Sequence, residues 1–95
     1  MPKLVLQVRT RHNLLELLAS GETPAWVVAE DREPLLTHVQ VVNFDGTQMI
    51  EGVYDRSGSC RREDGRLVVR FLDGRIVNCK IKFAAQNPVR FISGD

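Results

Sequence analysis

The 95-residue chain has few of the features that mark specialised classes of protein. It contains two cysteines and one tryptophan, and aromatic residues make up only 6% of it. No apolar run approaches the roughly 18 residues of a membrane helix. Met1-Pro2-Lys3 leads into an alternating segment rather than a signal peptide. We therefore expect a cytoplasmic protein with no membrane association.

An overall excess of charge of one sign is also missing. The formal net charge is +1, and the chain is 43% hydrophobic and 26% charged. These values are ordinary for a globular protein and exclude long disorder and low complexity. A chain of this length can bury roughly two thirds of its unfolded surface. We expect one domain, residues 1–95, with a single core.

The two cysteines are predicted to be free. If the segment that ends near Leu72 forms a strand between those carrying Cys60 and Cys79, two inter-strand spacings, about 9–10 Å, separate the thiols. A disulfide needs Cα atoms within roughly 7 Å. Neither cysteine has a second cysteine or a histidine at ligand spacing, so no metal is expected. Both are predicted to be small buried hydrophobes.

Candidate catalytic groups are scarce. His12 and His38 are 26 residues apart, and neither has a serine, cysteine or carboxylate beside it in the arrangement of a triad. The acidic residues Glu30, Asp31 and Glu33 lie in a predicted surface turn. No phosphate-binding loop of the Walker or dinucleotide type is present. We expect no enzymatic activity and no cofactor.

The first third of the chain predicts a strand, a helix and a second strand. Residues 3–9 alternate between apolar and polar side chains, as a half-buried strand does. Thr10 is the predicted N-cap of a helix that ends at Ser20, where Gly21 supplies a left-handed stop. Its leucines must pack against the sheet, because so short a helix is marginal alone. Residues 24–29 form an apolar run typical of a buried strand.

Three Asp-Gly dipeptides, Asp45-Gly46, Asp64-Gly65 and Asp73-Gly74, separate apolar segments in the rest of the chain. Such dipeptides favour hairpin turns, because glycine accepts a positive φ and aspartate tolerates the left-handed region. They predict a hairpin of residues 35–43 with 47–54 and another of residues 66–72 with 75–83. A short edge strand at 59–63 and a terminal strand at 89–92 complete the sheet.

Apolar spacing fixes the register of the last predicted hairpin. A three-residue loop at 72–74, with Gly74 left-handed in a bulge, pairs Val69 with Val77 and Leu67 with Cys79. The core face then also carries Phe71 and Phe83.

The opposite face of this hairpin is predicted to be basic, with Arg66 roughly opposite Lys80. Residues 1–55 carry a net charge of −4 and residues 56–95 a net charge of +5. An anion-binding surface for nucleic acid or an acidic partner is one interpretation, and a solvated sheet face is the other. Tyr54 and Phe91 are the remaining aromatic candidates for base stacking. The candidate anion-binding residues are Arg62, Arg66, Arg70, Lys80 and Lys82.

Trp26 is the candidate anchor for a protein partner. An indole between Ala25 and Val27 packs into a core by default, but tryptophan is also enriched at interface hot spots. Apolar strands with an open sheet edge also favour homodimerisation through that edge.

Taken together, these features predict an α+β fold. One short N-terminal helix packs on a strongly bent, mostly antiparallel sheet or small open barrel of six to eight strands, built from Asp-Gly hairpins. The predicted function is that of a small non-catalytic binding domain, a protein-interaction or regulatory module. The alternative is a nucleic-acid-binding module that uses the basic sheet face.

Overall fold

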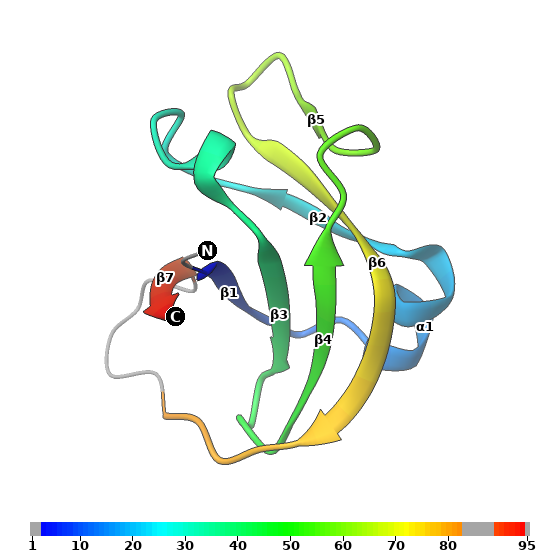
Figure 1. Cartoon of the computed structure of the whole chain (residues 1–95). Coiled ribbons are helices and arrows are strands. Elements are labelled where there is room, and N and C mark those ends of the chain that lie inside the picture. The colour runs from blue at the N-terminus through cyan, green and yellow to red at the C-terminus, as the bar shows by residue number, and fades with distance from the viewer. Residues whose placement is uncertain (1–2, 83–88, 95) are drawn as a thin grey trace.

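Residues 3–82 and 89–94 are described by a computed structural model, and they form an α+β fold dominated by one sheet (Figure 1). The elements are β1 (Lys3–Thr10), α1 (Leu14–Ser20), β2 (Glu22–Trp26), the 3₁₀ turn η1 (Glu33–Leu35), β3 (His38–Asn43), β4 (Gln48–Tyr54), β5 (Cys60–Arg61), β6 (Leu67–Asn78) and β7 (Val89–Gly94). Within the described residues, no helix is long and apolar enough to cross a bilayer.

The strands form a seven-stranded mixed sheet that does not close into a barrel. Its order is β2-β6-β4-β3-β1-β7, and β5 pairs with β6 beyond the end of β4. β1 and β3 are parallel, and the other pairs are antiparallel. The predicted small α+β fold with a mostly antiparallel sheet is therefore confirmed. The parallel pair was not predicted.

Helix α1 is shorter than predicted. Its N-cap is Asn13, whose side chain accepts hydrogen bonds from the backbone N–H groups of Leu15 and Glu16. The predicted cap, Thr10, instead belongs to β1, and its hydroxyl accepts from His12 N. The predicted left-handed stop at Gly21 is confirmed, with φ of 73°.

The predicted hairpin of residues 66–72 with 75–83 is wrong. Asp45-Gly46 lies between the antiparallel strands β3 and β4, and Asp64-Gly65 lies between β5 and β6. Asp73-Gly74 instead lies inside β6, which continues through it for twelve residues and follows a long curved course in Figure 1. The predicted pairs Val69–Val77 and Leu67–Cys79 do not form, because the second half of β6 pairs with β4.

A bulge accounts for this course of β6. Asp73, and not Gly74, takes the left-handed conformation, with φ of 55°, and the β4–β6 register shifts between Glu51 and Val53. The ring of Phe71 occupies the adjacent space: a Cβ built on Gly74 would lie 2.6 Å from it, and one on Gly52 3.1 Å. Glycine at positions 52 and 74 leaves space for the buried ring of Phe71. Neither glycine forms a hairpin turn.

The core lies on the inner side of the sheet, under α1 and the segment that follows β2. Leu67, Val69 and Phe71 share this side as predicted, each 5% exposed or less. Val28 and Leu36 cover them from the connecting segments. Phe83, the other residue predicted for the core face, lies outside the described residues. The core also contains Leu6, Val8, Leu14, Leu17, Val39, Val41, Ile50 and Tyr54.

Candidate functional site

The five basic residues predicted to share one face lie in two separate groups. Arg62 and Arg66 precede β6 and Arg70 lies near its start, whereas Lys80 and Lys82 follow it. A twelve-residue strand has a contour of about 40 Å. The predicted position of Arg66 opposite Lys80 is therefore wrong. All five side chains are exposed, but they do not form one cluster.

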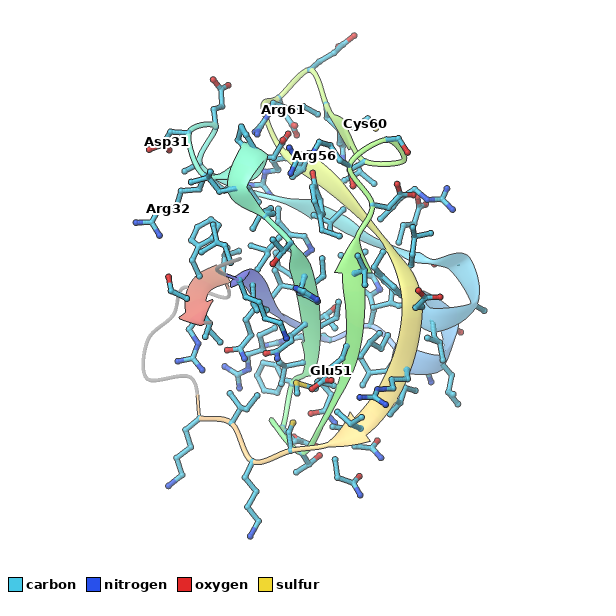
Figure 2. All side chains as sticks on the ribbon, in the orientation of Figure 1. Asp31, Arg32, Glu51, Arg56, Cys60 and Arg61 are labelled. Atoms are coloured by element: carbon cyan, nitrogen blue, oxygen red, sulfur yellow. The ribbon has the colours of Figure 1, made fainter. Side chains whose placement is uncertain are left out.

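Ion pairs offset some of the charge near the start of β6. Arg70 lies 3.9 Å from Glu22, and Arg61 lies 3.9 Å from Glu33. Arg61 also donates hydrogen bonds to the carbonyl oxygens of Val28 and Gly65, at 3.2 and 2.7 Å. Figure 2 shows Arg61 beside Arg56 and Cys60 at the β5 end of the molecule, away from Glu51. Arg61 thus connects the segment after β2 with the turn before β6, whereas Arg70 pairs across β6 and β2.

Trp26 lies at the end of β2 and is half-buried against the core. Its indole Nε1 donates a 3.0 Å hydrogen bond to the hydroxyl of Thr23. Val27, which follows it, is 69% exposed. The tryptophan therefore packs inward, and Val27 is the apolar side chain that this corner presents to solvent.

The histidines and cysteines do not come together. His12 is exposed, and His38 is half-buried with its Nδ1 2.8 Å from the hydroxyl of Thr37. Both cysteines are free, but the prediction that both are buried is wrong: Cys60 is exposed, and Cys79 is half-buried. Burial, with a smaller contribution from Glu51, raises the pKa of the Cys79 thiol. Among the described residues, no three histidine, cysteine or carboxylate side chains could hold a metal ion.

The face of the sheet opposite the core, the outer face, carries a polar row across β7, β1, β3, β4 and β6. The side chain of Arg90 donates from Nε to Gln7 Oε1 at 2.7 Å, and Gln7 Nε2 donates to Gln40 Oε1 at 2.8 Å. Gln40 lies opposite Glu51, which lies opposite Arg75 and 3.7 Å from its guanidinium. Gln7 is only 2% exposed.

Apolar side chains flank this row. Ile92, Val53 and Leu72 remain 38%, 40% and 53% exposed. A hollow of about 450 Å³ lies between the apolar and polar residues, and its lining includes Val5, His38, Val53, Glu51, Asp73 and Arg75. The charged residues among these are the acidic Glu51 and Asp73 and the basic Arg75, so the hollow carries charges of both signs.

The two end strands of the sheet differ in sequence. β2 contains Pro24, and proline cannot donate a hydrogen bond to an added strand. β7 contains no proline, and one charged residue, Arg90. Among the described residues, β7 pairs with β1 and with no other strand. β7 is the end strand better suited to strand addition.

A second basic cluster, which was not predicted, surrounds the turn between β3 and β4. The guanidinium carbons of Arg9 and Arg11 lie over the Phe44 ring, 4.0 and 4.4 Å from its centroid. Arg9 also donates from Nε and Nη2 to the Phe44 carbonyl oxygen, at 3.0 and 2.8 Å. Phe44 is 44% exposed.

The segment after β6 runs along the other side of this turn. Ile81 N donates to Gly46 O at 2.9 Å, and Cys79 N donates to Thr47 O at 2.9 Å. Lys80 and Lys82 flank Ile81 in sequence, and both are exposed. We call the cluster the Phe44 site; it comprises Arg9, Arg11, Phe44, Lys80 and Lys82.

The sequence alone indicated the residue types of this site but not their proximity. Arg9 ends a predicted strand, Arg11 follows two residues later at the start of the predicted helix, and Phe44 precedes an Asp-Gly turn. Their proximity depends on the parallel pairing of β1 with β3, in which Thr10 lies opposite Asn43. Lys80 and Lys82 were grouped with the wrong arginines, because the chain was predicted to reverse direction at Asp73-Gly74.

In comparisons with known proteins, no family model matches the chain, and neither a curated protein nor a solved structure is significantly similar to it.

Proposed function

We propose that this protein is a non-catalytic protein-interaction module that self-associates through its β7 edge. The observation that carries the proposal is that β7 ends the sheet without a proline, whereas the other end strand, β2, contains Pro24. The end strand of a sheet can act as a template for an added strand.

The hydrogen bonds of β1 fix which backbone groups of β7 face outward. Thr37 N donates to Leu4 O, so the even-numbered residues of β1 direct their backbone groups toward β3. The odd-numbered residues, including Val5 and Gln7, therefore direct theirs toward Ile92 and Arg90 of β7. The backbone groups of Phe91 and Ser93 consequently point to the side away from β1.

A second copy of β7 fits this edge in an antiparallel register centred on Ile92. Phe91 of each copy lies opposite Ser93 of the other, and each such pair exchanges two backbone hydrogen bonds. The two Ile92 side chains meet on the outer face, where each is 38% exposed in the single chain. Arg90 lies opposite Gly94, so no like charges face one another. This interface is isologous, as a two-fold dimer requires.

Ser93→Pro tests the proposal, because it removes an outward N–H and leaves the backbone pairing with β1 intact. We expect the wild-type protein to show a concentration-dependent dimer by light scattering, and Ser93→Pro to be monomeric. Ser93→Ala, which keeps the N–H, is the matched control and should dimerise. Circular dichroism verifies that each variant folds.

Ile92→Lys provides a second test that does not depend on proline. It places two ammonium groups opposite each other across the two-fold axis, so the dimer should weaken at low salt and recover partly as salt screens the charges. A wild-type chain that stays monomeric at all concentrations would overturn the proposal. So would a Ser93→Pro variant that dimerises as well as Ser93→Ala.

A further inference from the structure

The Phe44 site gathers positive charge from two segments that are distant in sequence. Arg9 and Arg11 come from β1 and the residue after it, and Lys80 and Lys82 follow β6. One carboxylate, Asp45, lies in the turn itself. Among the described residues the ion pairs are Arg61–Glu33, Arg70–Glu22 and Arg75–Glu51, and none includes Arg11, Lys80 or Lys82. A local excess of cations attracts a polyanion.

Hydrogen bonds hold the turn that carries the aromatic ring. Asn43 Oδ1 accepts from Thr47 N at 2.9 Å and from Gln48 N at 3.3 Å. Gly46 N donates to Asn43 O at 3.1 Å. The backbone bonds from Cys79 and Ile81 tie the lysine segment to the same turn. The turn that carries the ring and the backbone of the lysine segment are therefore held in place before any ligand arrives, which lowers the entropic cost of binding.

Besides charge, the two arginines provide planar guanidinium groups that are held against an aromatic ring. A guanidinium over an aromatic ring is held flat by cation–π attraction, and its N–H donors stay directed along the plane. Arg11 is exposed over the ring of Phe44, and 44% of Phe44 is accessible. Planar guanidinium groups and aromatic rings are the surfaces on which nucleic-acid bases stack.

We propose that the Phe44 site binds single-stranded nucleic acid. Lys80, Lys82 and the arginines interact with the phosphates, while the exposed plane of Arg11, which Phe44 supports from behind, stacks on unpaired bases. This supported guanidinium plane favours nucleic acid over an acidic protein segment, which offers carboxylates but no bases to stack. The proposed site is the turn between β3 and β4; it keeps Lys80 and Lys82 of the predicted anion-binding residues and leaves out Arg62, Arg66 and Arg70.

Fluorescence anisotropy with a labelled single-stranded DNA of about 12 nucleotides tests the proposal, since this length spans the footprint of a small binding domain. We expect binding at about 50 mM salt that weakens steeply as salt rises, because phosphate contacts release counterions. Lys80→Ala/Lys82→Ala should weaken binding about tenfold and reduce the log–log salt slope by about 1.4, or 0.7 for each lost phosphate contact.

Arg62→Ala/Arg66→Ala is the matched control, because it removes the same charge from exposed residues at the far end of β6. This variant should bind within about twofold of the wild type, as expected for lost long-range attraction alone. An equal loss in both double variants would overturn the site, because it would show that only total charge matters. Undetectable binding by the wild type at about 50 mM salt would overturn it as well.

Phe44→Leu separates stacking from charge. Loss of the ring should weaken binding of the oligonucleotide by about tenfold and leave binding of inorganic polyphosphate, which has no bases, within about twofold. An acidic peptide that binds as tightly as the oligonucleotide, and is insensitive to Phe44→Leu, would assign the site to a protein ligand and overturn the proposal.

Ser93→Pro lies outside the site, so this variant should bind the oligonucleotide as the wild type does. Failure of dimerisation and failure of nucleic-acid binding are therefore distinguishable.

Discussion

Gln7 and Gln40 face each other on the parallel strands β1 and β3, and the amide of Gln7 donates a 2.8 Å hydrogen bond to the side-chain oxygen of Gln40. Gln7 accepts a second bond from Arg90 of β7. A glutamine that is 2% exposed on a sheet face is thus satisfied by its neighbours on both sides. The pair connects three strands through side chains as well as through the backbone.

Gln7→Leu should destabilise the protein although it keeps the volume nearly constant. The substitution removes the donor to the half-buried Gln40 and the acceptor for Arg90, whose exposed side chain can bind water instead. The loss at Gln40 should cost about 1 kcal/mol, and chemical denaturation measures the change. Gln48→Leu is the control: Gln48 is exposed, so its loss should change the free energy of unfolding by less than about 0.5 kcal/mol. Equal effects would contradict the interpretation of the Gln7 contacts.

Local sequence patterns predicted the elements better than their partners. Alternation located β1, and Gly21 correctly ended the helix. The Asp73-Gly74 turn was wrong because the same dipeptide also suits a bulge, and the choice depended on the Phe71 ring packing against Gly52 of another strand. That contact joins residues far apart in sequence, so no local pattern contains it.

The Phe44 site was missed for a related reason. Its members were visible as residue types, but β1 had to pair in parallel with β3 to bring Arg9 beside Phe44. The strand β6 also had to run on to bring Lys80 to the same turn. Both pairings join residues far apart in sequence, and the wrong hairpin placed Lys80 and Lys82 beside Arg62 and Arg66, which lie at the other end of β6.

Gly46 and Gly65 allow a comparison of two turns with similar backbones. Both have positive φ, 75° and 85°. A Cβ on Gly46 would collide with the carbonyl oxygen of Ile81, whereas a Cβ on Gly65 has nothing within 4 Å. Gly65→Ala should therefore cost only the left-handed strain, about 1–2 kcal/mol. Gly46→Ala should cost clearly more, because the Ile81 segment must move. Thermal or chemical unfolding measures both, and similar losses would contradict the close packing at Gly46.

The two thiols should differ in reactivity. Cys60 is exposed, whereas Cys79 is half-buried and its Sγ lies 3.4 Å from Gly46 O. Burial raises the pKa of Cys79, so little of its reactive thiolate is present near neutral pH. Iodoacetamide at neutral pH should label Cys60 first, as mass spectrometry of peptides would show. Cys60→Ala should leave a chain that labels slowly until the pH is raised, and rapid labelling of that variant would contradict the prediction.

The burial of Tyr54 should make the free energy of unfolding fall at alkaline pH. The residue is 7% exposed beside the core, and burial raises the pKa of its hydroxyl above the ordinary value of 10.0, an effect that a hydrogen bond with Ser59 partly offsets. The unfolded chain therefore loses this proton at a lower pH than the folded chain does. The stabilisation is fully present below pH 10 and is lost as the pH rises through the folded pKa, because the unfolded state then binds fewer protons.

Denaturation at a series of pH values should show a decline that Tyr54→Phe lessens. Since Cys79 contributes a decline of the same sign, the comparison is made in a Cys79→Ala background, where an unchanged slope on adding Tyr54→Phe would show that Tyr54 is not responsible.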